Sequence, residues 1–179
     1  MTPIVLLDRL KEFIQENTGD IILAVRPVKN KTLPTPGPKP KSKPEPEEIT
    51  HRAAEVHLMR LPDKDAETNR VPYILLQYLT GKDAHEPGEQ PDSESRVRII
   101  IATYSENDSE GALDVLNVLT RIRNALLKAG VIGNQFLLRK PLEYMVYPDD
   151  TQPYFFGEMI SIWEMPKIKR EVNTNYGEE

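Results

Sequence analysis

A regular spacing of apolar residues is the clearest feature of the middle of the chain. Between residues 110 and 129, apolar side chains recur every three or four positions, which is the spacing of one face of an α-helix. This apolar stripe comprises Ala112, Val115, Leu116, Leu119, Ile122 and Leu126. Asp108 and Ser109 could cap the start of the helix, and Gly130 could take the left-handed conformation after its end. The spacing therefore predicts an amphipathic helix over residues 110–129, with this stripe in the core.

The segments on both sides of this helix have the alternating pattern of strands. Residues 96–104 are rich in β-branched side chains that alternate between two faces. Residues 135–138 form a short apolar run, and residues 153–165 form a long one. In the long run, one face carries Phe156, Glu158, Ile160, Ile162 and Glu164, and the other carries Phe155, Gly157, Met159, Ser161 and Trp163. The pattern predicts a helix laid across an antiparallel or mixed sheet.

The chain opens with a second helix. Thr2 is placed to cap it, Pro3 suits its first position, and residues 17–19 can end it. Its apolar stripe is Leu6, Leu7, Leu10, Phe13 and Ile14. Residues 21–25 are nearly all apolar, which predicts a short strand covered on both faces.

Further strands are predicted at residues 50–62 and 71–79, where apolar and polar positions again alternate or apolar residues dominate. Together these elements predict an α+β fold, in which a mostly antiparallel sheet is packed by an N-terminal helix and one long amphipathic helix. The length suits one domain with a sizeable core. We place this domain at residues 1–168 and expect residues 169–179 to form a flexible tail.

Two polar segments interrupt the predicted domain. Residues 27–48 contain seven prolines and five lysines, so we expect an extended, solvated insertion that cannot pair as a strand. The alternative for this segment is a basic arm that contacts DNA or a neighbouring subunit. Residues 81–95 hold five carboxylates and one lysine, a net charge of −4, which predicts a solvated hairpin loop. This acidic loop could also repel DNA or meet a basic partner surface.

Composition and motif content exclude several kinds of site. The chain has no cysteine, which excludes disulfides, thiol catalysis and cysteine–zinc sites, and its net charge of −5 disfavours a broad nucleic-acid-binding surface. His51 and His57 would lie about 20 Å apart along one strand, too far to share a metal ion. Asp149 and Asp150 follow a proline, as residues of turns do. With no phosphate-binding glycine loop or nucleophile elbow either, we predict no catalytic, cofactor-binding or metal-binding residues and no enzymatic activity.

The N-terminal sequence argues against targeting to a membrane. It lacks a basic region followed by a long apolar one, since a charge already follows at Asp8. No apolar run approaches the roughly 20 residues that span a bilayer. We expect the protein to be made and assembled in the cytoplasm of its host cell, without membrane contact.

The order of these elements resembles that of a known family. The resemblance covers residues 1–26 and 70–165, and it is carried by segments such as VRIIIATYSENDSEGALDVLNVLTRIRNALL (97–127) and YFFGEMISIWEMP (154–166). These features resemble the tail terminator proteins of long-tailed bacteriophages, which are also called tail completion or head–tail joining proteins. The resemblance rests on element order and not on an invariant motif, so no individual site residue is carried over.

This resemblance implies a structural protein of the virion. Members of the family form a hexameric ring that caps the tail tube, stops its polymerisation and joins the tail to the head. The implied partners are further copies of the chain, the tail tube protein and the head-completion or connector proteins, with DNA passing through the lumen without specific binding. The alternatives are another virion ring component, such as a head-completion adaptor or a tail tube protein, or a non-viral binding module.

Overall fold

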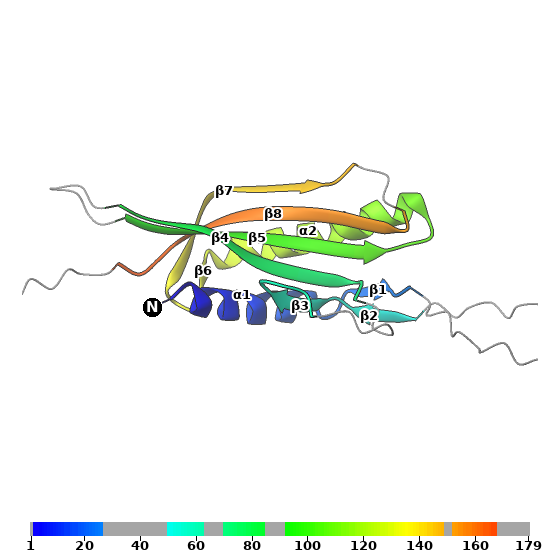
Figure 1. Ribbon diagram of the computed structural model, residues 1–179, viewed down its shortest axis with the longest axis horizontal. Coiled ribbons are helices and arrows are strands. Elements are labelled where there is room, and N and C mark those ends of the chain that lie inside the picture. Colours follow the sequence, from blue (N-terminus) through cyan, green and yellow to red (C-terminus); the bar gives the residue numbers. More distant parts are fainter. Residues whose placement is uncertain (1, 27–49, 63–69, 85–91, 149–151, 168–179) are drawn as a thin grey trace, which may run out of the picture.

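The computed structural model describes residues 2–26, 50–62, 70–84, 92–148 and 152–167. Within these residues the elements follow the order α1 (Pro3–Thr18), β1 (Ile22–Ala24), β2 (His51–Ala53), β3 (Glu55–Leu58), β4 (Tyr73–Ala84), β5 (Asp92–Tyr104), α2 (Asp108–Ala129), β6 (Val131–Ile132), β7 (Phe136–Val146) and β8 (Tyr154–Glu164) (Figure 1). These elements confirm the predicted α+β class. The predictions for the insertion at 27–48, for Asp149 and Asp150, and for the tail at 169–179 lie outside the described residues.

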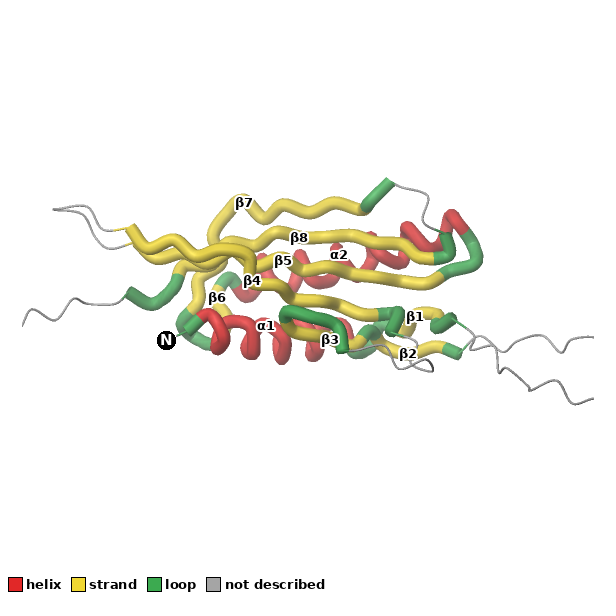
Figure 2. The backbone as a smooth tube through the Cα atoms, in the orientation of Figure 1, coloured by secondary structure: helices red, strands yellow, loops and turns green. Residues whose placement is uncertain are grey.

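Six of the strands form one sheet, in the order β3-β4-β5-β8-β7-β6. Its neighbouring strands are antiparallel except β3 and β4, which run parallel. β1 and β2 pair only with each other, in a separate two-stranded sheet. α2 contacts β5, β7 and β8, whereas α1 contacts β3, β4, β6 and α2 itself, so both helices pack against one face of the large sheet (Figure 2).

The core lies between this sheet face and the two helices. Ile99 and Ile101 of β5 and Met159 and Trp163 of β8 are fully buried there. Their alternate neighbours, such as Ile160, lie on the opposite face and are partly exposed. The alternation predicted for both strands is therefore confirmed.

α1 forms where it was predicted, with Phe13 of its predicted stripe only partly buried. Thr2 precedes it in an extended conformation (φ −113°, ψ 156°) and Pro3 is its first residue, but the predicted cap is not made, because the Thr2 side chain forms no capping hydrogen bond. Its buried residues are Leu6, Leu7, Leu10, Ile14 and Thr18. At its end the hydroxyl of Thr18 donates to the carbonyl of Ile14 at 2.8 Å, so this buried polar side chain is hydrogen-bonded within its own helix, and the N–H of Gly19 donates to the carbonyl of Gln15 at 3.0 Å.

The two ends of α2 match the prediction differently. Gly130 follows the helix with φ +65°, which confirms the left-handed residue predicted after its end. Its N–H donates to the carbonyl of Leu126 at 2.9 Å. The predicted caps Asp108 and Ser109 instead lie inside the helix, which begins at Asp108. The residue before the first turn is Asn107, a residue type that is preferred at the N-cap position.

The buried face of α2 also needs a correction. Leu116 was expected in the core, but its side chain is 42% exposed, whereas Val118 is buried. The reason is α1, which packs beside α2. Arg121, one turn after Val118, pairs with Asp20 just beyond α1 at 3.1 Å. The buried arc therefore extends toward α1 and away from Leu116.

Two strands predicted in the first half of the chain are arranged differently. Ile22 in β1 is 58% exposed, so only one face of this strand is covered, because β1 pairs with β2 outside the large sheet. The strand predicted at 50–62 is divided at Ala54 into β2 and β3, which belong to different sheets. His51 and His57 therefore do not share one face of a single strand.

The predicted acidic loop at 81–95 is largely strand. Residues 81–84 belong to β4 and residues 92–95 belong to β5, and only residues 85–91 lie outside the described part. Lys82 lies directly opposite Glu94, and such an opposite-charge pair stabilises neighbouring strands. Acidic residues that predicted a loop are here paired with basic residues on other strands.

β7 is longer than the strand predicted at 135–138. It continues to Val146, and its register with β8 shifts between Arg139 and Glu143. Pro141 lies inside this shifted stretch. A proline is tolerated at such a bulge near a sheet edge, where its missing N–H removes no ladder hydrogen bond, so it does not end the strand.

Gly157 of β8 lies where α2 comes closest to the sheet. A Cβ atom at this position would lie 2.6 Å from Cγ1 of Val115 and 3.0 Å from Cδ1 of Leu119. The close approach therefore requires a residue without a side chain. It brings the middle of α2 down onto the part of the sheet formed by β8 and β7.

Candidate functional site

Among the described residues, most of the outer edge of β7 has no neighbouring strand. β6 pairs only with Phe136 and Leu137 of this strand, and beyond Arg139 no strand in the described part of the chain lies on the side away from β8 (Figure 1). The N–H of Tyr147 donates to the carbonyl of Phe156 in β8 at 3.0 Å. Because backbone groups alternate in direction along a strand, those of Tyr144 and Val146 point away from β8. They form an edge that another strand could pair with.

Exposed apolar side chains flank this edge on both faces of the sheet. Tyr144 and Met145 are 45% and 46% exposed, and as successive strand residues they point to opposite faces. On α2, the exposed residues Leu113, Leu116 and Leu127 form a second stripe, beside the buried one. We call the surface made by these five residues and Arg123 the β7–α2 surface.

Arg123 joins the two parts of the β7–α2 surface. Its guanidinium lies 5.7 Å from the ring centroid of Tyr144, a cation–π arrangement. Since Arg123 is seven residues after Leu116, the two lie on nearly the same side of the helix. The exposed leucines therefore continue toward the open edge. Single exposed apolar residues are ordinary on protein surfaces, but several of them beside a strand edge that has no described neighbour are typical of an interaction site.

A polar contact across three strands holds this edge in place. Arg98 of β5 pairs with Glu158 of β8 and donates to the hydroxyl of Tyr147, just after β7, at 3.0 Å. Burial of the Arg98 and Glu158 side chains is only partial. The contact fixes the end of β7 relative to the centre of the sheet, on the face opposite the helices.

A second charged cluster binds β7 to the β4–β5 hairpin. Nη1 of Arg139 donates to Oδ2 of Asp92 at 3.2 Å, and Nη2 donates to Oδ1 of Asp92 and, at 3.2 Å, to Glu164. Glu94 lies 3.6 Å from the same guanidinium. The hydrogen bond from Arg139 lowers the pKa of Asp92, and it raises the pKa of Arg139. The cluster explains why acidic residues of the predicted loop lie in ordered strands.

Removal of the Asp92 charge should change how stability depends on pH. The folded-state pKa of Asp92 lies below its unfolded value of about 3.9, so its pair with Arg139 stabilises the fold above that value and is lost as pH falls through the folded pKa. The loss of stability in Asp92→Asn should therefore be greatest near neutral pH and shrink on acidification. Urea midpoints measured from pH 7 to pH 3 test this. Asp8→Asn, on the exposed side of α1, is the control; the same profile for both variants would contradict the role of the pair.

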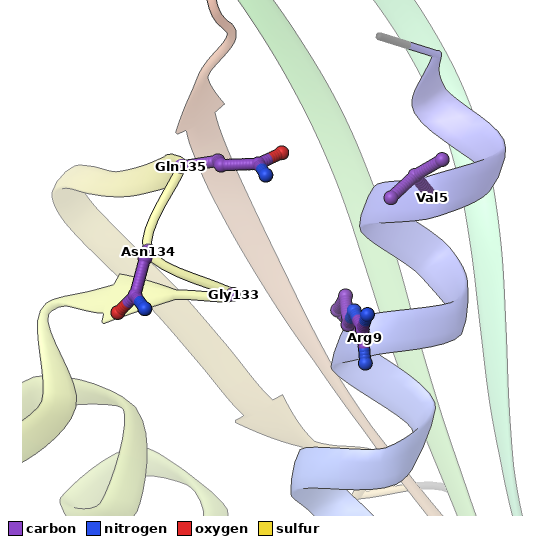
Figure 3. Close-up of a pocket in the computed structure, with 5 residues that line it drawn as sticks. All are labelled: Val5, Arg9, Gly133, Asn134 and Gln135. Atoms are coloured by element: carbon purple, nitrogen blue, oxygen red, sulfur yellow. The ribbon is translucent and has the colours of Figure 1, made fainter.

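A shallow hollow lies between the first turns of α1 and the β6–β7 turn. It has a volume of about 380 Å³ and is lined by Val5 and Arg9 of α1 and by Gly133, Asn134 and Gln135 of the β6–β7 turn. Figure 3 shows the Gln135 side chain extending toward α1. Arg9 pairs with Glu12 at 2.9 Å and its stem passes close to Gly133. The hollow offers no further charged group for a ligand.

No group of three histidine or acidic side chains in the described residues could hold a metal ion. His57 has a carboxylate neighbour, Glu55, at 3.5 Å, and burial lowers the pKa of His57. No helix in the same residues is long and apolar enough to cross a membrane. The β7–α2 surface is therefore the candidate site. The sequence pattern placed one of its residues, Leu116, in the core and did not single out the others.

Comparison with known proteins adds little. No family model matches the chain, and no curated protein matches it. Among solved structures, one that bears no functional name is similar with a TM-score of 0.44 and 12% sequence identity, over 66% of this chain and 83% of that chain. A similarity this weak carries no argument about function.

Proposed function

We propose that this chain is a tail terminator protein of a long-tailed bacteriophage. In this proposal, copies of the chain form a hexameric ring in the virion, at the junction between tail and head. The ring caps the tail tube, stops its growth and provides the surface to which the head joins. The protein acts by assembly and not by catalysis, after it is made in the host cytoplasm.

The β7–α2 surface is the observation that carries this proposal. A closed ring of identical subunits uses heterologous contacts, in which two different patches of each subunit meet. The open edge of β7 offers backbone groups, and the exposed side chains of Leu116, Leu127, Tyr144 and Met145 offer apolar area. Both are kinds of surface that subunit contacts bury. The net charge of −5 suits a ring that lets DNA pass without binding it.

The alternatives use the same surface with other partners. A head-completion adaptor or a tail tube protein would also assemble into rings, but a tube protein would stack along the length of the tail. A non-viral binding module would remain a monomer and take up a strand of another protein along β7. Ring formation by itself therefore does not separate the virion proteins, and an assay on growing tails is needed.

We expect the purified protein to cap growing tail tubes and to stop their growth. The measurement mixes the protein with polymerising tube protein and records tube lengths and ends by electron microscopy. Tubes with one capped end and an arrested length support the proposal. Tubes that keep growing, or that carry this protein along their length, contradict it. In infected cells, loss of the protein should leave heads intact and tails of uncontrolled length or without heads.

A matched pair of variants connects this assay to the surface. Leu116→Glu places a charge on the exposed stripe of α2, where burial against a neighbour would be costly, so capping should be lost while the fold remains. Asn117→Glu is the control, since it adds the same charge at the next exposed position, about 100° around the helix. Equal activity of the two variants would show that the β7–α2 surface is not the contact used in assembly.

A further inference from the structure

Beyond the short pairing with β6, the outer strands of the large sheet are β3 on one side and β7 on the other. Residues 56–58 and residues 144–146 of these two strands lie at the same height along the strand direction. Adjacent registers trace rows of residues across the sheet, from β3 at one side to β7 at the other. One row is Val56, Ile74, Ile101, Gly157 and Val146; the next is His57, Leu75, Ile100, Glu158 and Met145; the third is Leu58, Leu76, Ile99, Met159 and Tyr144. Residues 56–58 of β3 therefore stand at the same level as residues 144–146 of β7.

The two edges also match in direction. β3 runs parallel to β4, and each step from β4 to β5, to β8 and to β7 reverses the strand direction. Three reversals leave β7 antiparallel to β3. A second copy placed beside the first, without a shift along the strands, would bring its β3 against β7 as an antiparallel neighbour.

The backbone groups match as well. The N–H of Met59 donates to the carbonyl of Leu76 in β4 at 2.7 Å, so by alternation the groups of Val56 and Leu58 point away from β4. On β7 the outward groups belong to Val146 and Tyr144, which stand at the levels of Val56 and Leu58 respectively. Within the described residues, no strand pairs with the outer side of β3. The carbonyl of Leu58 accepts the N–H of Arg60 at 2.6 Å. Among the described residues, no backbone group bonds to the N–H of Leu58 or to the outward groups of Val56, so these are available for pairing.

We propose that neighbouring subunits join by strand addition, in which β7 of one copy pairs antiparallel with β3 of the next, at the levels Val146–Val56 and Tyr144–Leu58. This inference deepens the proposed function and rests on it for the ring. A second copy of this chain is the occupant because level, direction and outward groups agree between the two edges of the same molecule. Each copy uses both edges, so the contact is heterologous and can close.

The chemistry of the pairing predicts which side chains approach one another. His57 and Met145 lie in the same row, on the face away from the helices, and their backbone groups point inward to their own sheets. Across the proposed contact they form a non-hydrogen-bonded pair, in which Cα atoms lie about 4.5 Å apart. Leu58 and Tyr144 would meet on the face of the sheet that carries the helices. On that face the exposed leucines of α2 would add apolar area to the contact that Tyr144 makes.

Engineered cysteines provide the test, because the natural chain contains no cysteine. The variant carrying His57→Cys and Met145→Cys is oxidised and run on a non-reducing gel. We expect a ladder of covalent multimers that ends at the ring and collapses on reduction. Within one chain the two positions are separated by four strand spacings of about 4.8 Å, beyond the reach of a disulfide. The control pairs His57→Cys with Tyr144→Cys, whose side chains point to opposite faces, and it should not cross-link.

A second variant tests the backbone pairing. Tyr144→Pro removes an N–H that points away from β8, so the fold should persist while ring assembly is lost. Tyr144→Ala is the control, since it also loses the ring of Tyr144 but keeps the N–H. We expect Tyr144→Ala to retain more assembly than Tyr144→Pro. Equal assembly of both variants would overturn strand addition at this position.

The outcomes separate this contact from the proposed function. Rings seen by electron microscopy without cross-links in the His57→Cys, Met145→Cys variant would overturn the strand pairing and leave the tail terminator proposal standing. Cross-links formed by Met145→Cys alone would indicate two β7 strands paired about a two-fold axis, and would also overturn it. Cross-linked rings that fail to stop tube growth would support the contact and contradict the terminator function. Folded protein that forms neither rings nor cross-links would contradict both.

Discussion

Replacement of Leu119 with alanine should lower the free energy of unfolding by about 2–5 kcal/mol. Leu119 is fully buried in the middle of α2 and lies against Gly157, where the helix comes closest to the sheet. Truncation removes apolar contacts and leaves a cavity that this close approach does not let the helix fill. Urea unfolding followed by fluorescence measures the change, since Trp163 is the single tryptophan and lies in the same core.

Leu116→Ala is the matched control for this experiment. It makes the same chemical change on the same helix, but Leu116 is 42% exposed, so the cost should be under about 1 kcal/mol. The comparison also tests the orientation of α2, because the apolar spacing alone places both leucines in the core. Similar costs for the two variants would mean that α2 is rotated relative to the sheet.

Trp163→Ala should also destabilise the protein strongly, by about 3–5 kcal/mol. Trp163 is among the largest fully buried side chains. Its Nε1–H donates to the hydroxyl of Ser161 at 2.9 Å, and that hydroxyl donates to the carbonyl of Val97 at 3.1 Å. The indole thus fills the core and completes a short chain of hydrogen bonds between β8 and β5. Thermal and urea unfolding followed by circular dichroism measure the loss, because this variant has no tryptophan fluorescence.

Trp163→Phe separates the two contributions of the indole. Phenylalanine keeps much of the apolar volume but has no N–H, so it removes the hydrogen bond to Ser161 while the hydroxyl still donates to Val97. We expect a loss of about 1–2 kcal/mol, in the range of one buried hydrogen bond and a small cavity. If Trp163→Phe were as unstable as Trp163→Ala, the hydrogen-bond chain would outweigh the packing of the ring.

The side-chain contacts at the two ends of β7 hold this strand in a fixed position, as suits an edge that pairs with a neighbouring subunit. Arg139 ties the start of the strand to Asp92 of the hairpin, and Arg98 ties its end through Tyr147. A preorganised edge loses less conformational entropy on association than a mobile one. Proline at position 141 restricts pairing at one end of the edge, which concentrates any strand addition on residues 142–146.

The elements themselves follow from local sequence. Periods of 3.6 and 2 residues express which side of a helix or strand is apolar, and this information is present in a few neighbouring positions. For that reason α1, the extent of α2 to within two residues, the central strands β5 and β8, and the α+β class were predictable. Gly130 was predictable for the same kind of reason, because a left-handed residue after a helix depends on local backbone conformation.

The tertiary structure decided what depends on residues distant in the chain. Leu116 and Val118 are both apolar, and only the position of α1 beside α2 determined which of them is buried. The acidic residues of 81–95 were predicted as a loop, and Asp92 is held in a strand by an arginine 47 positions later in the chain. The division of 50–62 between two sheets and the continuation of β7 past Pro141 likewise depend on which strands are neighbours. The candidate surface belongs to this second group, because an apolar side chain looks the same in sequence whether the fold covers it or leaves it exposed.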